Sequence, residues 1–260
     1  MEEVKFATLT TVTQIDTHFL RSYTFPVPAF VHRADVWVFT IILGLLFPLA
    51  DHFFFSRLKT TLQVYLWNIL SVWTLAAVAA WLVYRHGLSL SDFGQTFGTY
   101  PRTLIACAVL VVLVAALVLV NKLQKRKPSP EKMAELTAKV RKLLPVTRTE
   151  RIAAIFLALS AGFGEEFLYR GWLLTVTGQA LHSVWVGLIV SSILFGFAHL
   201  YQGRNGMLST GCLGLVFGLI YIASASLLPG QILHAALDLQ NLLSLGRIAS
   251  HTSPTTRPNL

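Results

Sequence analysis

Charged residues are scarce in this chain of 260 residues: they make up 13% of it, whereas hydrophobic residues make up 54%. Soluble globular proteins are about one quarter charged. So little charge argues against an ordinary soluble fold, and the missing charge indicates a lipid-facing surface. We therefore predict an all-α fold, a polytopic transmembrane bundle of about seven to eight helices, at roughly 20 apolar residues per span. Any active site would then lie within the membrane.

Cysteine is also rare, and both cysteines, Cys107 and Cys212, fall inside apolar runs. This argues against a disulfide framework and against a cysteine-based metal site. The N-terminus lacks a basic region followed at once by an apolar core, so we expect no cleavable signal peptide. Motifs for binding nucleic acid are absent, and membrane orientation and anionic lipid headgroups explain the net charge of +9. The lipid bilayer is thus an expected partner and nucleic acid is not.

Apolar runs separated by polar stretches organise the chain. The runs cover residues 36–55, 62–84, 103–120, 152–176, 184–200, 207–224 and 228–245. We divide the chain into an N-terminal entry segment (1–35), N-terminal transmembrane helices (36–121), a basic loop (122–151), a transmembrane core (152–246) and a polar tail (247–260). The basic loop is expected in the cytoplasm, because lysine and arginine favour that side, and residues 131–144 can form a surface helix.

Ionisable residues inside a span cost roughly 2.5–3.5 kcal/mol each on insertion scales, so they mark functional sites. The first motif of this kind is Gly-Glu-Glu-Phe-Leu-Tyr-Arg, which begins at Gly164. In a helix, Glu166 and Arg170 share a face and can neutralise each other. Glu165 points about 100° away, which leaves one carboxylate free. A free carboxylate in a low-dielectric site can act as a general base on water.

The surroundings of this motif give two further expectations. Tyr169 and Trp172 should share the face of Glu165, and the glycine-rich residues 161–164 should form a turn of non-helical backbone. A plainer interpretation also stands: Glu165 and Glu166 would mark a helix end at the membrane surface.

A second motif, Phe-Gly-Phe-Ala-His, ends the next span at His199. Phe195 lies on the same face as His199 and can fix its ring, and the small residues Gly196 and Ala198 allow close approach of another helix. By itself, His199 is more often explained as an interfacial histidine near Tyr201.

A third motif, His-Ala-Ala-Leu-Asp, lies in the last span. His234 and Asp238 are four residues apart, so both side chains project into one place. Gln231 and Asn241 continue this face as candidate supporting residues. Alone, the pair is also consistent with an interhelical hydrogen bond.

Together, the three motifs resemble those of the CPBP family, also called the Abi family, which includes the CAAX-type prenyl-protein endopeptidases. The family signature is Glu-Glu-x-x-x-Arg, then Phe-x-x-x-His, then His-x-x-x-Asn/Asp. All three elements are present in order, within about residues 150–245. The resemblance implies an intramembrane endopeptidase and identifies residues 152–246 as a CPBP-like catalytic core.

The resemblance also implies roles for individual residues. Glu165 would activate water with His199 beside it, and His234 and Asp238 would bind or polarise the scissile carbonyl. The supporting residues would be Glu166, Arg170, Phe195 and Asn241. An ionised aspartate cannot donate a hydrogen bond to an oxyanion as asparagine can. Asp238 must therefore be protonated, orient His234, or hold water.

Zinc is a possible cofactor, although none is favoured. Two histidines and two carboxylates suffice for a zinc site with an open position, and the candidate ligands are Glu165, His199, His234 and Asp238. The His-Glu-x-x-His helix of many zinc proteases is absent. A metal-free mechanism based on a glutamate is the better supported one for CAAX members of the family, so we expect that mechanism here.

The substrate implied by the resemblance is a membrane-anchored or lipidated protein or peptide, cut near a terminus. A prenylated CAAX tail, a bacteriocin-type peptide and a C-terminally sorted surface protein all remain open. Localisation would be multi-pass, in the plasma (inner) membrane if the source is prokaryotic and in the endoplasmic reticulum if it is eukaryotic. The pattern specifies no oligomeric state. Two rival functions are a non-catalytic immunity or scaffold protein of the same fold and a proton-coupled transporter, which the lack of internal repeats disfavours.

Overall fold

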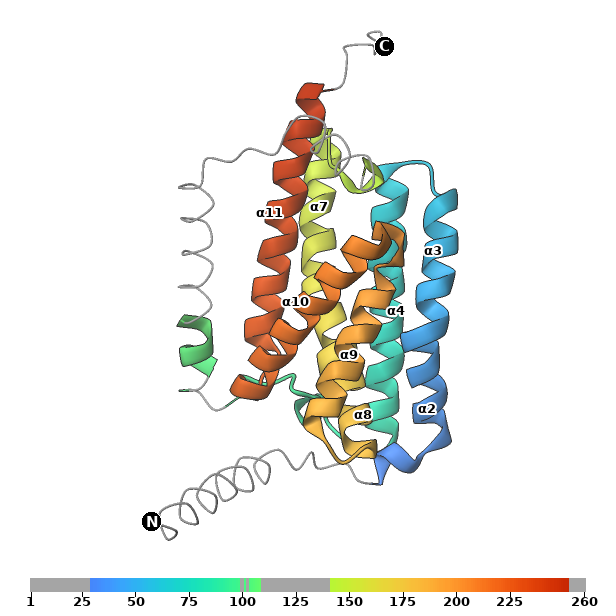
Figure 1. Ribbon diagram of the computed structural model, residues 1–260, viewed down its shortest axis with the longest axis vertical. Coiled ribbons are helices and arrows are strands. Elements are labelled where there is room, and N and C mark those ends of the chain that lie inside the picture. Colours follow the sequence, from blue (N-terminus) through green and yellow to red (C-terminus); the bar gives the residue numbers. More distant parts are fainter. Residues whose placement is uncertain (1–28, 99–100, 102, 109–140, 253–260) are drawn as a thin grey trace, which may run out of the picture.

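A computed structural model describes residues 29–98, 101, 103–108 and 141–252. Every regular element among these residues is helical, which confirms the predicted all-α bundle. Figure 1 shows α4, α7 and α11 running along the long axis, with α10 inclined to them. Contacts between elements place α7 between α4 and α11, and α9 against α10.

The described elements have the following bounds, in chain order. A short 3₁₀ turn, η1 (Phe30–His32), precedes a continuous helix built from α2 (Ala34–Ile41), the π-helical η2 (Ile42–Leu46) and α3 (Phe47–Arg57). The next elements are α4 (Thr61–Arg85) and the 3₁₀ turns η3 (Leu90–Phe93) and η4 (Arg141–Leu143). A second continuous helix is built from α7 (Arg148–Ser160), the π-helical η5 (Ala161–Glu165) and η6 (Phe167–Leu174), and α8 (Thr175–Ala180). The last elements are α9 (Val184–Ala198), the 3₁₀ turn η7 (Leu200–Gln202), α10 (Gly203–Ser224) and α11 (Leu228–Thr252).

Two helices begin at capping boxes, in which side chains satisfy the backbone N–H groups of the first turn. The Thr60 hydroxyl accepts from the backbone N–H of Gln63, and the Thr147 hydroxyl accepts from that of Glu150. Because of the second box, α7 begins at Arg148. The apolar run had predicted that this helix begins at residue 152, four residues later. At the other end of the chain, α11 continues to Thr252, past the predicted boundary at residue 246.

Four described helices are long and apolar enough to cross a membrane: Ala34–Arg57, Thr61–Arg85, Arg148–Ala180 and Leu200–Ser224. Large apolar side chains lie exposed on their outer faces, and among them are Leu66, Trp81, Phe156 and Leu208. A water-soluble protein rarely exposes so much contiguous apolar surface. The chain is therefore a multi-pass integral membrane protein.

Some predicted elements fall largely outside the described residues. These are most of the entry segment, the end of the 103–120 run after its helical residues 103–108, and the surface helix of 131–144, of which only η4 is described. The end of α3, the start of α7 and the end of α11 lie at the same end of the bundle, drawn at the top in Figure 1. Lys142 closes this end by donating to the carbonyls of Phe55 and Ser56, at the end of α3.

Trp172 lies at the centre of the core and not beside Glu165, which corrects the expectation that the two share a face. Its ring is fully buried, and its indole N–H donates to the Thr40 hydroxyl over 3.0 Å. Phe39 contacts it edge to face, and Phe93 stacks on it. The wider turn of the π-helical backbone changes the angles between side chains, so the α-helical wheel misplaced this residue.

Gly162 lets η5 approach α11 closely. A Cβ atom at this position would lie 2.7 Å from the Ala235 Cβ and 2.7 Å from the Gln231 carbonyl oxygen, closer than atoms can pack. The prediction of a turn of non-helical backbone at residues 161–164 is wrong, because these residues are helical. The glycines lie in continuous π-helix, and they are needed because another helix packs directly against them.

We predict that Gly162→Ala destabilises the protein by about 1–3 kcal/mol, because the added methyl overpacks the contact with α11. Thermal unfolding in detergent micelles measures the effect. The matched control is Gly211→Ala, whose Cβ would make only an ordinary contact, 3.4 Å from the Ser192 carbonyl oxygen. A melting temperature of Gly162→Ala equal to that of Gly211→Ala would contradict this account of the packing.

Candidate active site

The two adjacent glutamates lie on different sides of the second continuous helix. Glu165 ends the π-helical segment η5, and Glu166 lies between η5 and η6. Single turns of π-helix are rare and are frequent at functional sites. Glu166 is buried in the bundle, whereas Glu165 is half-buried beside a cavity. The motif therefore supplies one carboxylate to the interior and one to the cavity.

Glu166 binds two basic side chains through one oxygen. Its Oε1 accepts from Arg170 Nη1 over 2.9 Å and lies 2.9 Å from His234 Nδ1. An ionised carboxylate only accepts hydrogen bonds, so Nδ1 of His234 carries the proton in this contact. The predicted Glu166–Arg170 pair is present, and it extends to α11 through a histidine that the sequence suggested for another role.

Aromatic rings cover this buried cluster. The Arg170 guanidinium lies 4.1 Å from the centroid of the Phe195 ring, and the Phe217 ring stacks on His234 with centroids 5.1 Å apart. Phe195 also contacts the ring of His199 edge to face. Phe195 thus lies between the buried Arg170 and the ring of His199, and its role in fixing that ring stays a prediction.

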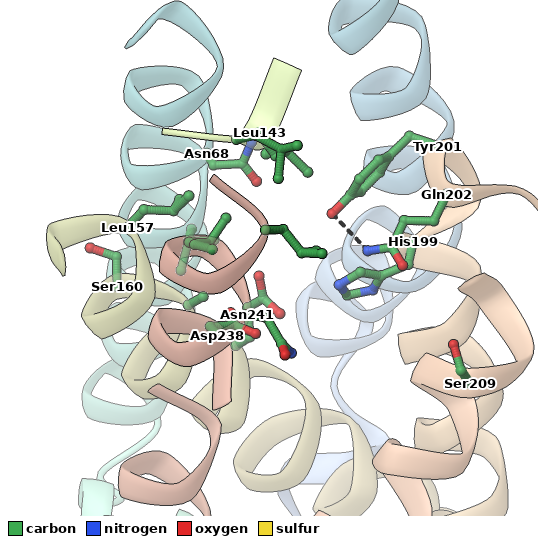
Figure 2. Close-up of a pocket in the computed structure, with 16 residues that line it drawn as sticks. Asn68, Leu143, Leu157, Ser160, His199, Tyr201, Gln202, Ser209, Asp238 and Asn241 are labelled. Atoms are coloured by element: carbon green, nitrogen blue, oxygen red, sulfur yellow. Dashed lines mark hydrogen bonds between the residues drawn. The ribbon is translucent and has the colours of Figure 1, made fainter. Parts of the chain in front are cut away.

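A cavity of about 500 Å³ lies between α4, α7 and α11 on one side and the α9–α10 junction on the other. Its polar lining includes Glu165, His199, Asp238 and Asn241. Figure 2 shows His199 and Tyr201 facing Asp238 and Asn241 across this space. Leucine side chains make up much of the remaining wall: Leu143, Leu144, Leu157, Leu242 and Leu245. The cavity thus combines an apolar wall with convergent polar groups, as a binding site requires.

His199 presents one ring nitrogen to the cavity. Its Nδ1 lies 2.9 Å from the carbonyl oxygen of Phe195, one turn earlier in α9. Since a carbonyl oxygen only accepts, Nδ1 carries the proton in this contact, and Nε2 is left with a lone pair. This arrangement suits His199 to accept a proton or a hydrogen bond from water.

His234 and Asp238 are neighbours, as the spacing predicted, but they lie at different depths. His234 Nε2 is 3.5 Å from Asp238 Oδ2. Asp238 lines the cavity, whereas His234 is buried behind it and does not. The expectation that both side chains face a substrate is therefore corrected: His234 reaches the cavity only through Asp238. The spacing sets the face of the helix that the two residues share, and it does not set how deeply each is covered.

Sequence reasoning missed several residues of the site. The cavity is also lined by Asn68 of α4, Ser160 of α7 and Tyr201 of η7. Gln231, which was expected to support the third motif, donates to Gln95 Oε1 over 3.0 Å and to the Phe163 carbonyl over 3.2 Å. Asn68 carried a usable signal, since it is a polar residue inside an apolar run.

The candidate metal ligands do not form a metal-binding cluster. Across the described ranges, no three His, Cys, Asp or Glu side chains are placed to hold one ion. Both ring nitrogens of His234 face carboxylates, and Nδ1 of His199 faces a backbone carbonyl. The residues in this arrangement do not fit a zinc site, and we derive no step through a metal.

We predict that Arg170→Ala lowers the stability of the protein by about 3–5 kcal/mol, because Glu166 then stays buried without the guanidinium group that neutralises it. Melting temperature in detergent measures the loss, and Arg204→Ala, at an exposed arginine, is the control. The double variant Glu166→Gln/Arg170→Met should recover part of it, since no uncompensated charge remains. A normal melting temperature for Arg170→Ala would show that the pair contributes little.

Comparison with protein families identifies the part of the chain that holds the site. Residues 147–240 match the family model described as type II CAAX prenyl endopeptidase Rce1-like. No curated protein and no solved structure gives a significant match. The matched residues run from the capping box of α7 to α11, and they include every residue of the three motifs. This region of the chain is therefore similar to the Rce1-like CAAX proteases, which is consistent with the CPBP family.

Proposed function

We propose that the protein is an intramembrane endopeptidase in which Glu165 activates water to hydrolyse a peptide bond. One observation carries the proposal: Glu165 Oε2 is buried and has no hydrogen-bond partner among the described residues, in a side chain that lines the cavity. A buried polar atom without a partner is costly. The atom is therefore placed for a ligand, and water is the simplest one that fits beside a carboxylate.

Glu165 and His199 act together on this water. The carboxylate accepts one hydrogen of the water, and Nε2 of His199 accepts the other, which leaves an oxygen lone pair directed at the substrate. As the water oxygen bonds to the scissile carbonyl carbon, its proton moves to Glu165. The C–N bond then breaks, and Glu165 returns the proton to the leaving amine.

Asp238, supported by His234, stabilises the negative charge that develops on the carbonyl oxygen. Nδ1 of His234 donates to Glu166, so its Nε2 and the Asp238 carboxyl group can share one proton over their 3.5 Å separation. With that proton on Asp238, the carboxyl group donates a hydrogen bond to the oxyanion as it forms. Such preorganised donors supply a large part of catalysis in a low-dielectric site.

The apolar wall of the cavity favours an extended or lipid-associated peptide segment. No lysine or arginine is among the described residues that line it. We propose a membrane-anchored or lipidated protein or peptide as substrate, cut near a terminus. The family match supports this class, and a prenyl group is one of the lipids that the leucine-rich wall would accommodate.

We predict that Glu165→Gln abolishes turnover while the protein still inserts and folds, because an amide cannot accept the proton of water. The test compares the termini of membrane proteins in the native host between wild type and Glu165→Gln at matched expression. Asp35→Asn is the control, since Asp35 pairs with His86 and lines neither the main cavity nor its neighbour. Uncut segments that accumulate only in Glu165→Gln would establish proteolysis and name the substrate. Identical termini in all three strains would favour a non-catalytic scaffold or a transporter.

We also predict that Asp238→Asn keeps turnover within about tenfold of wild type, whereas Asp238→Ala loses on the order of 10²–10³. The amide N–H of asparagine can donate to the oxyanion, and alanine offers no donor. Rates of appearance of the new termini in solubilised membranes measure both. Equal loss in the two variants would contradict the role of Asp238 as a donor.

A further inference from the structure

A second, smaller chamber of about 40 Å³ adjoins the main cavity. Its polar lining consists of Asp51, Asn68, Glu165, Tyr169, His199 and Tyr201. Asn68, Glu165, His199 and Tyr201 line the main cavity as well, so these residues form the wall between the two spaces. The small chamber lies on the side of α3 and contains a carboxylate that belongs to none of the three motifs.

That carboxylate, Asp51, is only 6% exposed although it lies in an apolar helix. Its Oδ1 accepts a hydrogen bond from the indole N–H of Trp67 over 2.7 Å. Within the described part of the chain, its Oδ2 accepts no hydrogen bond. Because Asp51 lines the chamber, this second oxygen is available to a hydrogen-bond donor there, and a carboxylate in so apolar a helix gains from such a donor. Glu165 Oε2, in another part of the chamber wall, is buried without a hydrogen-bond partner among the described residues, and leaving it so is costly.

Water fits the chamber in both size and chemistry. A volume of about 40 Å³ holds on the order of one to three waters, and it is too small for a substrate side chain of any length. A buried water needs two to four polar partners. Two carboxylates accept from it. The hydroxyl of Tyr201 accepts from Gln202 Nε2 over 3.1 Å, which leaves its own hydrogen free to donate.

The location of the chamber matters once a substrate fills the main cavity. A peptide segment there displaces bulk water, and the apolar bundle admits none from the lipid side. Water behind the wall that contains Glu165 is not displaced. We propose that this chamber stores the water that hydrolysis consumes, and that Asp51 is a positioning residue that holds the water beside Glu165.

This inference rests on the proposed function and adds one residue to it. A stored water donates one hydrogen to Asp51 and the other to Glu165, then moves to the substrate side as the previous one is consumed. Asp51 forms no bond to the substrate and keeps no proton. The atoms balance as before: the water oxygen joins the carbonyl carbon, and its proton reaches the amine through Glu165.

The first test needs no substrate. An experimental structure of the full chain, at a resolution that shows ordered water, should contain water between Asp51 and Glu165 in the wild type. In Asp51→Asn this density should weaken or move, because the amide replaces an acceptor by a donor. A dry chamber in the wild type would overturn the proposal.

The second test separates a positioning role from a structural one. Asparagine has the size of aspartate and can still accept from Trp67, so Asp51→Asn should leave the melting temperature unchanged. Its kcat should fall by about tenfold to a hundredfold while KM stays within about twofold, as expected for misplaced water. The probe is a dilution series of detergent-solubilised host membranes, in which newly formed termini are quantified. Asp35→Asn, in the same continuous helix, is the control.

Glu165→Gln in the same series distinguishes a failure of the proposed function from a failure of the role of Asp51. An inactive Glu165→Gln with a slow Asp51→Asn supports both. An inactive Glu165→Gln with a wild-type kcat for Asp51→Asn overturns the role of Asp51 and leaves the proposed function standing. An active Glu165→Gln overturns the proposed function, and the role of Asp51 in it falls as well.

Discussion

A single buried carboxylate, Glu166, organises the whole site. Its Oε1 receives Arg170 from its own helix and His234 from α11, each over 2.9 Å. These bonds fix how the two helices face each other in a region where water cannot compensate for a lost partner. Because Glu166 is committed to the interior, its neighbour Glu165 is directed to the cavity. Two adjacent identical side chains thus acquire different surroundings and different chemistry.

Glycine residues and π-helical backbone allow the two glutamates to face different surroundings. Gly162 lies against Ala235, and Gly164 lies against Val72, where a Cβ would be 2.2 Å from the Val72 Cγ1. Helices on both sides of η5 therefore contact its backbone directly. Close packing of this kind holds Glu165 in place without a hydrogen bond to its buried Oε2. The carboxylate stays available for water, at the expense of stability in the free protein.

Much of this was predictable from the sequence, and the failures have physical reasons. The apolar runs predicted the described helices because lipid requires long apolar segments, and the motif spacing correctly paired Glu166 with Arg170. An α-helical wheel misplaced Trp172, since the backbone there is π-helical. The spacing of His234 and Asp238 gave their common face but not their depth. Asn68 and Asp51 were missed because they come from α4 and α3, and only tertiary packing brings these helices to Glu165.

The central claim is that Glu165 delivers water to a peptide bond, and isotope labelling tests it most directly. Purified wild-type protein and Glu165→Gln are incubated with solubilised host membranes in water enriched in ¹⁸O, and new C-termini are analysed by mass spectrometry. The account predicts that new C-terminal carboxylates carry one ¹⁸O atom from the solvent and that they form only with the wild type. New termini that form equally with Glu165→Gln, or no new termini with either protein, would contradict it.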